Sequence, residues 1–263
     1  MEFFYFQSKK KKLFGIYHPP VSEIQRIGVV LCNPLGQEHI RCYYAILELA
    51  NKLSKMGFHV LRFDYSGTGE SEGDFKDLSI NNLMCDIETA IEEIKTGTQI
   101  EKIYLVGLRL GAALAFKASL KLPIDAIVMW SPILNGEKHL KELKSINSFY
   151  TQNWLNDNNE KSLPTNDSFE SLGFIINHPL YESLSNLNLF IDIPDKDLEI
   201  LIMDSINDNN TIEFVKYLTD KSNKVSVLGV KNERFWLKNE NEMEKSLVPV
   251  EDINTITDWI NNL

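Results

Sequence analysis

The segment "VGLRLGAALA", from Val106 to Ala115, has residue types and spacing suited to presenting a reactive side chain. The apolar run before it predicts a buried strand, and the alanine-rich run that ends it predicts a helix. Gly107 and Gly111 flank Arg109 symmetrically, which is the spacing of the G-x-S-x-G turn that holds a serine nucleophile between a strand and a helix. Arg109 stands where that serine would be. The sequence therefore predicts a nucleophile turn without its nucleophile.

Hydrolysis at such a turn needs a nucleophile, a histidine that takes its proton and a carboxylate that orients the histidine. A guanidinium has no accessible lone pair and stays protonated at any reachable pH, so Arg109 cannot be the nucleophile. Every histidine of the chain precedes the last predicted core strand, which ends at Val230. The histidines are His18, His39, His59, His139 and His178.

The elements that must position this turn alternate along the chain between apolar strands and amphipathic helices. After two opening strands, the pattern predicts core strands at 26–32, 59–64, 102–106, 125–130, 198–204 and 224–230. Helices are predicted between them, and such alternation is typical of a parallel sheet covered by helices on both faces. The predicted fold class is therefore α/β.

Residues 134–190 interrupt this rhythm, because they are rich in Asn, Ser, Lys and aromatic residues and show no clear strand alternation. A compact domain rarely contains so long a structureless loop, so we expect an inserted, mostly helical cap over one edge of the sheet. The predicted domains are an α/β core formed by 1–133 and 191–263, and a cap formed by 134–190.

Two further motifs accompany the turn. The segment "FDYSGTGESEG" places Asp64, Gly67, Gly69 and Ser71 in a D-x-x-G-x-G-x-S pattern, and the loop "CNPLGQEH" comes at the end of the strand at 26–32. With the turn and the strand order, these motifs resemble the α/β-hydrolase superfamily, and more narrowly its serine-aminopeptidase-like and lipase-like branch, over nearly the whole chain. The segments "GLRLGA" and "MWSPILNGEKHL" are also similar to predicted hydrolases associated with the bacterial exosortase system. The resemblance implies an α/β-hydrolase fold, with a mostly parallel central sheet, helices on both faces and an inserted helical cap.

The same resemblance implies roles for residues around the turn. The oxyanion-hole donors would be the backbone N–H groups of Leu35 and Leu110, and the triad acid would be Asp208, with Asp204 as the second choice. The base would follow the last core strand, where the residues "KNERFWLKNENEMEK" contain no histidine. Since two coupled triad members are missing, we do not expect acyl-enzyme chemistry at this turn.

A cation at the start of a helix is electrostatically unfavourable, so Arg109 should need a compensating anion. One hypothesis is an internal carboxylate that fills the space left by the missing serine and histidine. That carboxylate would be Asp208 or, failing that, Glu233 or Glu38. The alternative is a ligand carboxylate or phosphate, held by the arginine together with the two oxyanion-hole amides.

Other side chains are candidates for the same cavity. His39 follows the expected oxyanion loop and is either an acid or base or a surface residue at a helix start. Trp130 either lines a pocket beneath the cap or packs the cap against the sheet. The same alternatives hold for the aromatic residues Phe149, Tyr150, Trp154, Phe174 and Tyr181. The sequence contains no cluster with metal-ligand spacing and no Walker-type or dinucleotide fingerprint, so neither a metal nor a cofactor is expected.

The composition and charge of the chain limit the classes of partner that we expect. A net charge of −10 and a pI near 5.1 argue against a nucleic-acid surface. The lysine run at 9–12 is either the tip of a hairpin or a binding patch. No stretch approaches the ~18 apolar residues needed to span a bilayer, and the three cysteines lack C-x-x-C spacing, so we expect a cytoplasmic protein. The sequence is compatible with a small acyl or carboxylate ligand and with a protein partner.

Three functions are compatible with these observations, because a fold alone does not fix a function. The favoured interpretation is a non-hydrolytic binding or accessory protein of a biosynthetic pathway. The second is an enzyme with other chemistry in the same cavity, using the preorganised amides and Arg109. The third is a hydrolase of ester, thioester or amide substrates whose nucleophile lies elsewhere.

Overall fold

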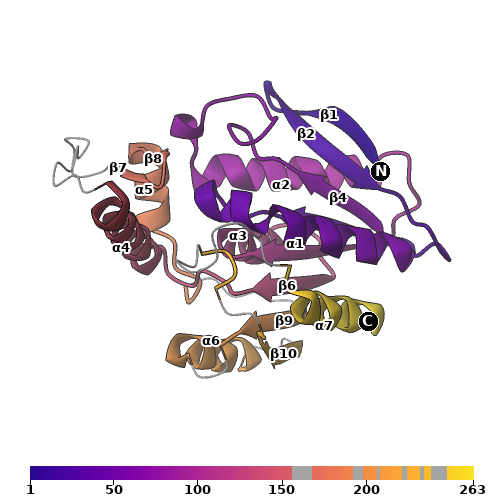
Figure 1. Cartoon of the computed structure of the whole chain (residues 1–263). Coiled ribbons are helices and arrows are strands. Elements are labelled where there is room, and N and C mark those ends of the chain that lie inside the picture. Colours follow the sequence, from indigo (N-terminus) through magenta and orange to yellow (C-terminus); the bar gives the residue numbers. More distant parts are fainter. Residues whose placement is uncertain (156–167, 192–197, 206–207, 221–223, 232–233, 238–247) are drawn as a thin grey trace.

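The computed structural model describes residues 1–155, 168–191, 198–205, 208–220, 224–231, 234–237 and 248–263, apart from the side chains of 151–155. In this part of the chain, eight strands form one sheet in the order β1-β2-β4-β3-β5-β6-β9-β10 (Figure 1). The strands are β1 (Glu2–Ser8), β2 (Lys11–His18), β3 (Ile27–Cys32), β4 (His59–Phe63), β5 (Lys102–Leu108), β6 (Ala126–Trp130), β9 (Glu199–Asp204) and β10 (Lys224–Gly229).

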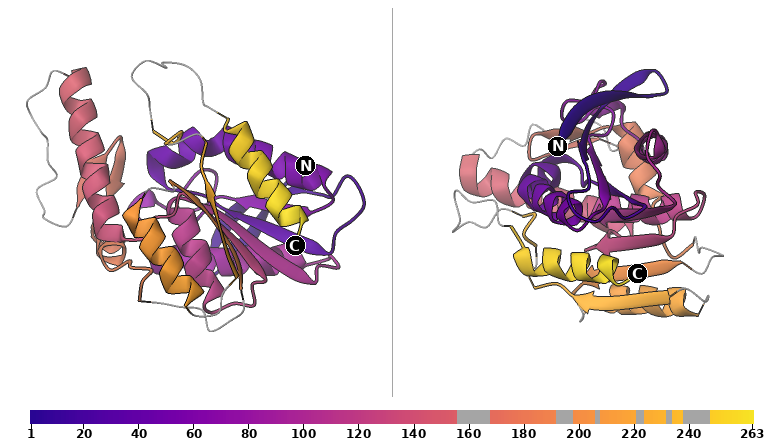
Figure 2. Two further views of the ribbon diagram at one scale, coloured as in Figure 1. Left: turned by 90° about the horizontal axis from the view of Figure 1, so that it is seen from below. Right: turned by 90° about the vertical axis from the view of Figure 1, so that its right-hand side faces the viewer.

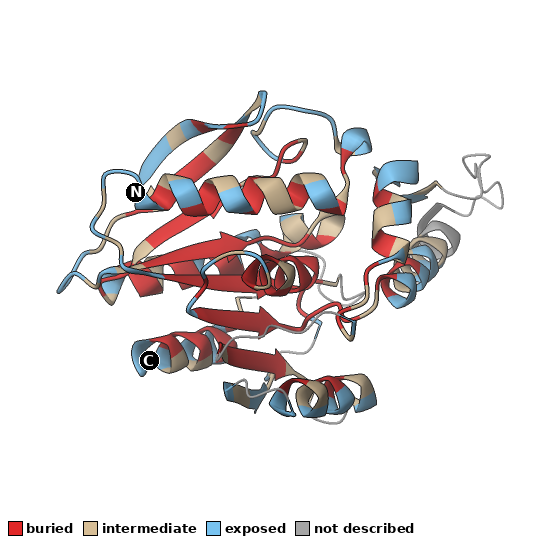
Figure 3. Ribbon diagram, turned by 180° about the vertical axis from the view of Figure 1, so that it is seen from behind, coloured by how far each residue is buried: buried red, intermediate tan, exposed pale blue. Residues whose placement is uncertain are grey.

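The sheet is mostly parallel. Only β1 with β2 and β2 with β4 pair antiparallel, while the remaining neighbours of the sheet run parallel. Parallel strands buried on both faces require continuous apolar runs, and "IGVVLC" of β3 and "AIVMW" of β6 meet this requirement. The central strands are buried along most of their length (Figure 3). The predicted mostly parallel sheet is confirmed.

Helices cover both faces of the sheet, as predicted. Helices α1 and α7 contact each other on one face, and α2 and α3 contact each other on the other (Figures 1 and 2). In α1, Cys42, Ile46, Leu49 and Leu53 recur at helical spacing and are all buried. The core helices are α1 (Gly36–Lys55), α2 (Ile80–Lys95), α3 (Leu110–Ser119), α6 (Asn209–Thr219) and α7 (Val250–Asn261), with a short 3-10 helix η1 (Phe75–Asp77).

The chain between β6 and β9 forms the cap, which is defined here as α4 (Gly136–Leu155), β7 (Phe169–Ser171), β8 (Phe174–Ile176) and α5 (His178–Ser185). It lies to one side of the sheet, beyond the ends of the parallel strands (Figure 1). Its two ends meet, because Asn135 and Asn188 form a β-bridge. The expected helical insertion is present, but the antiparallel pair β7–β8 was not predicted.

The structure also bears on the lysine run at 9–12 and on possible membrane-spanning helices. Lys9 and Lys10 form the turn between β1 and β2, so the lysine run lies at the tip of a hairpin. No helix in the described ranges combines the length and the apolar character needed to cross a membrane.

Candidate functional site

The turn between β5 and α3 has the geometry that the sequence predicts. Arg109 is the N-cap residue of α3 and has a positive φ of 56° with ψ −118°, a strained combination for a residue with a side chain. The flanking glycines allow the backbones to approach closely. A Cβ at Gly107 would lie 2.3 Å from the carbonyl oxygen of Gly111, and a Cβ at Gly111 would lie 2.0 Å from that of Cys32. Only glycine fits at these two positions, so the turn is built into the packing of the core.

The backbone of Arg109 is held from both sides. Its N–H donates to the carbonyl oxygen of Trp130 at 2.9 Å, and its own carbonyl oxygen accepts from the N–H of Ile133 at 3.3 Å. These bonds join the turn to the end of β6 and compensate for the unfavourable backbone angles, which cost on the order of 1–3 kcal/mol. The side chain of Arg109 therefore projects from a rigid base.

Two carboxylates pair with the guanidinium, which belongs to a residue only 8% exposed. Nε of Arg109 donates to Oε1 of Glu38 at 3.0 Å, and Nη2 donates to Oε2 of Glu142 at 2.8 Å. Glu38 lies in the first turn of α1 and Glu142 lies on α4 of the cap, so one side chain connects three helices. Trp236 covers the guanidinium, with its ring centroid 4.6 Å from the guanidinium carbon.

The preferred partner in the sequence-based hypothesis was wrong. Asp208 does not pair with Arg109, because it caps α6 and accepts a hydrogen bond from the N–H of Thr211 at 3.1 Å. Of the two further choices, Glu38 is a partner, while Glu233 lies outside the described residues. Glu142 was not predicted. Glu142 reaches Arg109 only because the cap folds back over the core, and the spacing of residues in the sequence does not reveal this.

The charges in this cluster stabilise one another. Burial opposes the charged form of Arg109, but Glu38 and Glu142 outweigh it and raise the pKa of the arginine. Burial also raises the pKa of Glu142, yet the hydrogen bond from His139 and the charge of Arg109 lower it to about 2. His139 itself is 6% exposed, and its Nδ1 lies 3.4 Å from Oε2 of Glu142. The arginine is therefore held in an ionic cluster that is buried at Arg109 and partly exposed at Glu142.

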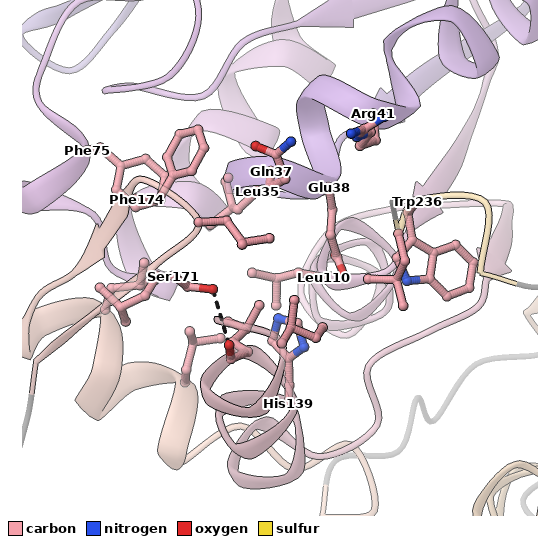
Figure 4. A pocket seen from close by; sticks show the side chains of 18 of the residues that line it. Leu35, Gln37, Glu38, Arg41, Phe75, Leu110, His139, Ser171, Phe174 and Trp236 are labelled. Carbon is pink, nitrogen blue, oxygen red and sulfur yellow. Dashed lines mark hydrogen bonds between the residues drawn. The ribbon is translucent and has the colours of Figure 1, made fainter. Parts of the chain in front are cut away.

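A cavity of about 310 Å³ lies beside this cluster, between the start of α1, the start of α3 and the cap (Figure 4). Its lining is predominantly apolar. Glu38, His139 and Trp236 lie along one side of it, close to Leu110 (Figure 4). The apolar lining includes Leu35, Leu110, Leu143, Ile146, Phe174 and Leu184.

The expected oxyanion-hole residues lie at the edge of this cavity. The side chains of Leu35 and Leu110 line it, and neither backbone N–H has a hydrogen-bond acceptor among the described residues. Two free amides beside a cavity are able to bind a carbonyl oxygen. Their role as an oxyanion hole stays a prediction.

The expected acid positions hold carboxylates with structural partners. Burial raises the pKa of Asp204, the second choice for the triad acid, and Thr211 donates to its Oδ2 at 2.7 Å. Neither Asp204 nor Asp208 is bonded to a histidine within the described part of the chain. Each carboxylate instead holds the start of α6.

The two other pocket candidates lie elsewhere. His39 is in the first turn of α1, 3.6 Å from Oδ1 of Asp64, and it lines a neighbouring cavity. Trp130 is fully buried and packs against Phe235 at 5.0 Å between ring centroids, so of its two alternatives it does not line the cavity beside Arg109. Tyr150 and Phe174 do line the cavity, whereas the Trp154 side chain is outside the described residues.

Sequence reasoning missed His139, Glu142 and Trp236. The first two stand three residues apart on α4, a spacing that places them on one helix face and was the available signal. Trp236 follows β10 in the segment where the resemblance implies a histidine, and its indole packs on the guanidinium of Arg109. No group of three or more potential metal-ligating side chains occurs within the residues described.

The mostly parallel sheet, the turn between β5 and α3 and the inserted cap define this chain as a protein of the α/β-hydrolase fold. It belongs to the serine aminopeptidase S33 family, whose pattern matches residues 25–186.

Several known proteins are similar over shorter or longer stretches. The chain is 32% identical over 74 residues to bovine mitochondrial palmitoyl-protein thioesterase ABHD10, which is 28% of this chain and 23% of that protein. It is 31% identical over 100 residues to zebrafish lysophosphatidylserine lipase ABHD12, covering 36% of this chain and 25% of the lipase. The matched segments thus span about a quarter of the length of these relatives.

Solved structures share the fold at low sequence identity. Est1E from Butyrivibrio proteoclasticus, solved with ferulic acid bound, has a TM-score of 0.67 and 16% identity, with 98% of both chains covered. Mouse ABHD10 has a TM-score of 0.61 and 16% identity, covering 100% of this chain and 99% of that chain. These likenesses concern the fold alone.

Proposed function

We propose that this protein binds a small apolar ligand, or the apolar part of one, without hydrolysing it, and acts as a binding or accessory component of a biosynthetic pathway. The observation that carries the proposal is the buried cluster in which Arg109 occupies the nucleophile turn between Glu38 and Glu142. A nucleophile position filled by a neutralised cation leaves a binding cavity but no attacking group.

The surroundings of the turn also argue against acyl transfer. Ser171 is the serine side chain lining the described cavity, and it donates to the carbonyl oxygen of Leu143 at 3.4 Å rather than to a histidine. Trp236 packs on the guanidinium from the segment where a base would be expected. Because the triad works as a unit, loss of both nucleophile and base removes the covalent route.

The ligand class follows from the charges and the lining of the cavity. Since Glu38 and Glu142 already satisfy Arg109, that guanidinium has no free capacity for an anionic ligand, and Arg41 is a cation that lines the cavity without an ion pair among the described residues. The apolar lining favours an acyl chain or a similar apolar group, with any carbonyl oxygen directed at the amides of Leu35 and Leu110. Relatives whose names refer to palmitoyl-protein and lysophosphatidylserine support an acyl ligand.

A labelling experiment tests the absence of hydrolysis. The purified protein is incubated with a fluorophosphonate probe and with p-nitrophenyl butyrate, beside an active serine esterase as positive control. We expect no labelling and no ester cleavage above the buffer rate. Robust labelling that maps to a serine such as Ser171 would support the displaced-nucleophile hydrolase and contradict the proposal.

A binding experiment tests the ligand. Native mass spectrometry compares the wild type with Leu143→Trp, which fills the cavity, and with Ile212→Trp at a 40% exposed position on α6. Binding of decanoic acid methyl ester is expected in the wild type and in Ile212→Trp and should be lost in Leu143→Trp. Equal binding by all three proteins would contradict a ligand site in this cavity.

A further inference from the structure

A second cavity, of about 830 Å³, lies between α1, the β1–β2 hairpin and the glycine-rich loop after β4. It shares Gly36, Phe75 and Phe174 with the cavity beside Arg109, so these residues form a wall between the two. The rings of Phe75 and Phe174 are 5.1 Å apart and lie together at the edge of the first cavity (Figure 4). Nothing in the function proposed above uses this second cavity.

The second cavity contains a buried cation without an ion pair. Arg62 of β4 is 5% exposed and lines the cavity. Its Nε donates to Nε2 of His18 at 3.1 Å, and its guanidinium carbon lies 5.5 Å from the ring centroid of Tyr43. Neither partner is an anion. Burial lowers the pKa of Arg62, while Tyr43 and Asp64 favour its charged form, and no carboxylate among the described residues lies within ion-pair distance of it. Buried charges are normally paired, as Arg109 is, so this guanidinium has unused capacity for an anion.

The walls around Arg62 are aromatic and partly open to solvent. Tyr43 and Tyr44 on α1 are 45% and 56% exposed, and Phe3 on β1 is 63% exposed. The rings of Phe3 and Phe14 stack at 6.3 Å between centroids. A cavity that combines aromatic walls with one fixed polar anchor is typical of small-molecule sites.

We propose that Arg62 binds the carboxylate of a small organic acid whose aromatic or apolar body lies against Tyr43, Tyr44 and Phe14. The guanidinium presents its planar fork to the carboxylate, as Arg–carboxylate pairs do. Asp64 and Glu70 line the same cavity and select for a single negative charge, because a dianion such as a phosphate monoester meets more repulsion from them. The site is independent of Arg109 and stands whether or not the first cavity binds an acyl ligand.

Calorimetry with three probes tests this site. The probes are 4-phenylbutyrate, its uncharged amide 4-phenylbutanamide and phenyl phosphate. We expect the wild type to bind the carboxylate about tenfold or more tightly than the amide, which corresponds to a hydrogen bond to a charged group. Phenyl phosphate should bind more weakly than the carboxylate. Equal affinity for carboxylate and amide, no saturable binding, or tighter binding of phenyl phosphate would overturn the proposal.

Substitutions test whether the carboxylate binds in this cavity. Arg62→Met should abolish the preference for the carboxylate, whereas Arg26→Met, at an exposed arginine paired with Glu101, should leave it unchanged. If Arg62→Met fails to fold, Tyr43→Ala at its exposed position should weaken binding of 4-phenylbutyrate by about tenfold, since it removes the aromatic wall. Leu143→Trp should leave this binding intact. Loss in Leu143→Trp, or unchanged binding in Arg62→Met or Tyr43→Ala, would place the carboxylate elsewhere and overturn the proposal.

Discussion

Arg109 shares its buried position with two acids, and the stability of the cluster depends on keeping the three charges together. Taking charges out of water is costly, and the mutual attraction of the ions offsets this cost only while each keeps its partner. The need for an anion was predictable from the sequence, because a cation at a helix start is unfavourable. The residues that supply this anion were not predictable, because Glu38 and Glu142 come from different elements that are far apart along the chain.

Removal of the cation should destabilise the protein. Arg109→Met leaves Glu38 buried without its partner, and we expect the free energy of unfolding to fall by about 3–5 kcal/mol. Because the Glu142 side chain is 34% exposed, we expect the lower part of that range. Urea denaturation followed by circular dichroism measures the change. The control Arg26→Met, in an exposed pair, should cost about 1 kcal/mol or less, and an equal effect of the two substitutions would contradict the buried-cluster interpretation.

At the scale of elements, the order of strands and helices was predictable because each core element keeps a regular apolar pattern. The run of β6 and the spaced apolar residues of α1 are examples. The pair β7–β8 was not predictable in this way, because its strands have three residues each and are too short to show alternation. The turn between β5 and α3 was recognisable from its two glycines, because Gly107 packs against the start of α3 and Gly111 against the end of β3.

Substitution of Gly111 by alanine should disrupt this packing. The added Cβ would lie 2.0 Å from the carbonyl oxygen of Cys32, which is backbone and cannot move aside. We expect a loss of more than about 3 kcal/mol in unfolding free energy, above the usual cost of overpacking. The matched control is Gly97→Ala, where φ is +71° but no atom lies within 4 Å, with an expected cost of about 1–2 kcal/mol. Similar losses at both positions would contradict the close approach to Cys32 as the main source of the loss at Gly111.

At the scale of the whole molecule, the ion pair between Arg109 and Glu142 is a polar connection from the core to the cap. The pKa of Glu142 is lowered in the folded protein from its usual 4.5 to about 2. A lowered carboxyl pKa contributes stability that is complete above pH 4.5 and is lost as the pH falls towards 2. The connection should therefore weaken in acid.

A pH series checks this consequence. The unfolding free energies of wild type and Glu142→Gln are compared between pH 6 and pH 2.5 by urea denaturation. We expect the wild type to be the more stable above about pH 4.5, and the difference to shrink as the pH falls. Amide hydrogen exchange should be faster in α4 of the variant, because its link to the core is weaker. A difference that stays constant with pH would exclude the ionised Glu142 as its source.

The two acids beside Arg109 also determine how an esterase could be engineered on this scaffold. Substituting Arg109 by serine alone would leave Glu38 and Glu142 without their cation, and the imidazole next to Glu142 is that of His139 on the cap, not one that follows β10. A designer would need to replace both acids, clear the space that Trp236 fills and graft a histidine after β10. Engineering hydrolysis therefore requires rebuilding the neighbours of the turn as well as the turn itself.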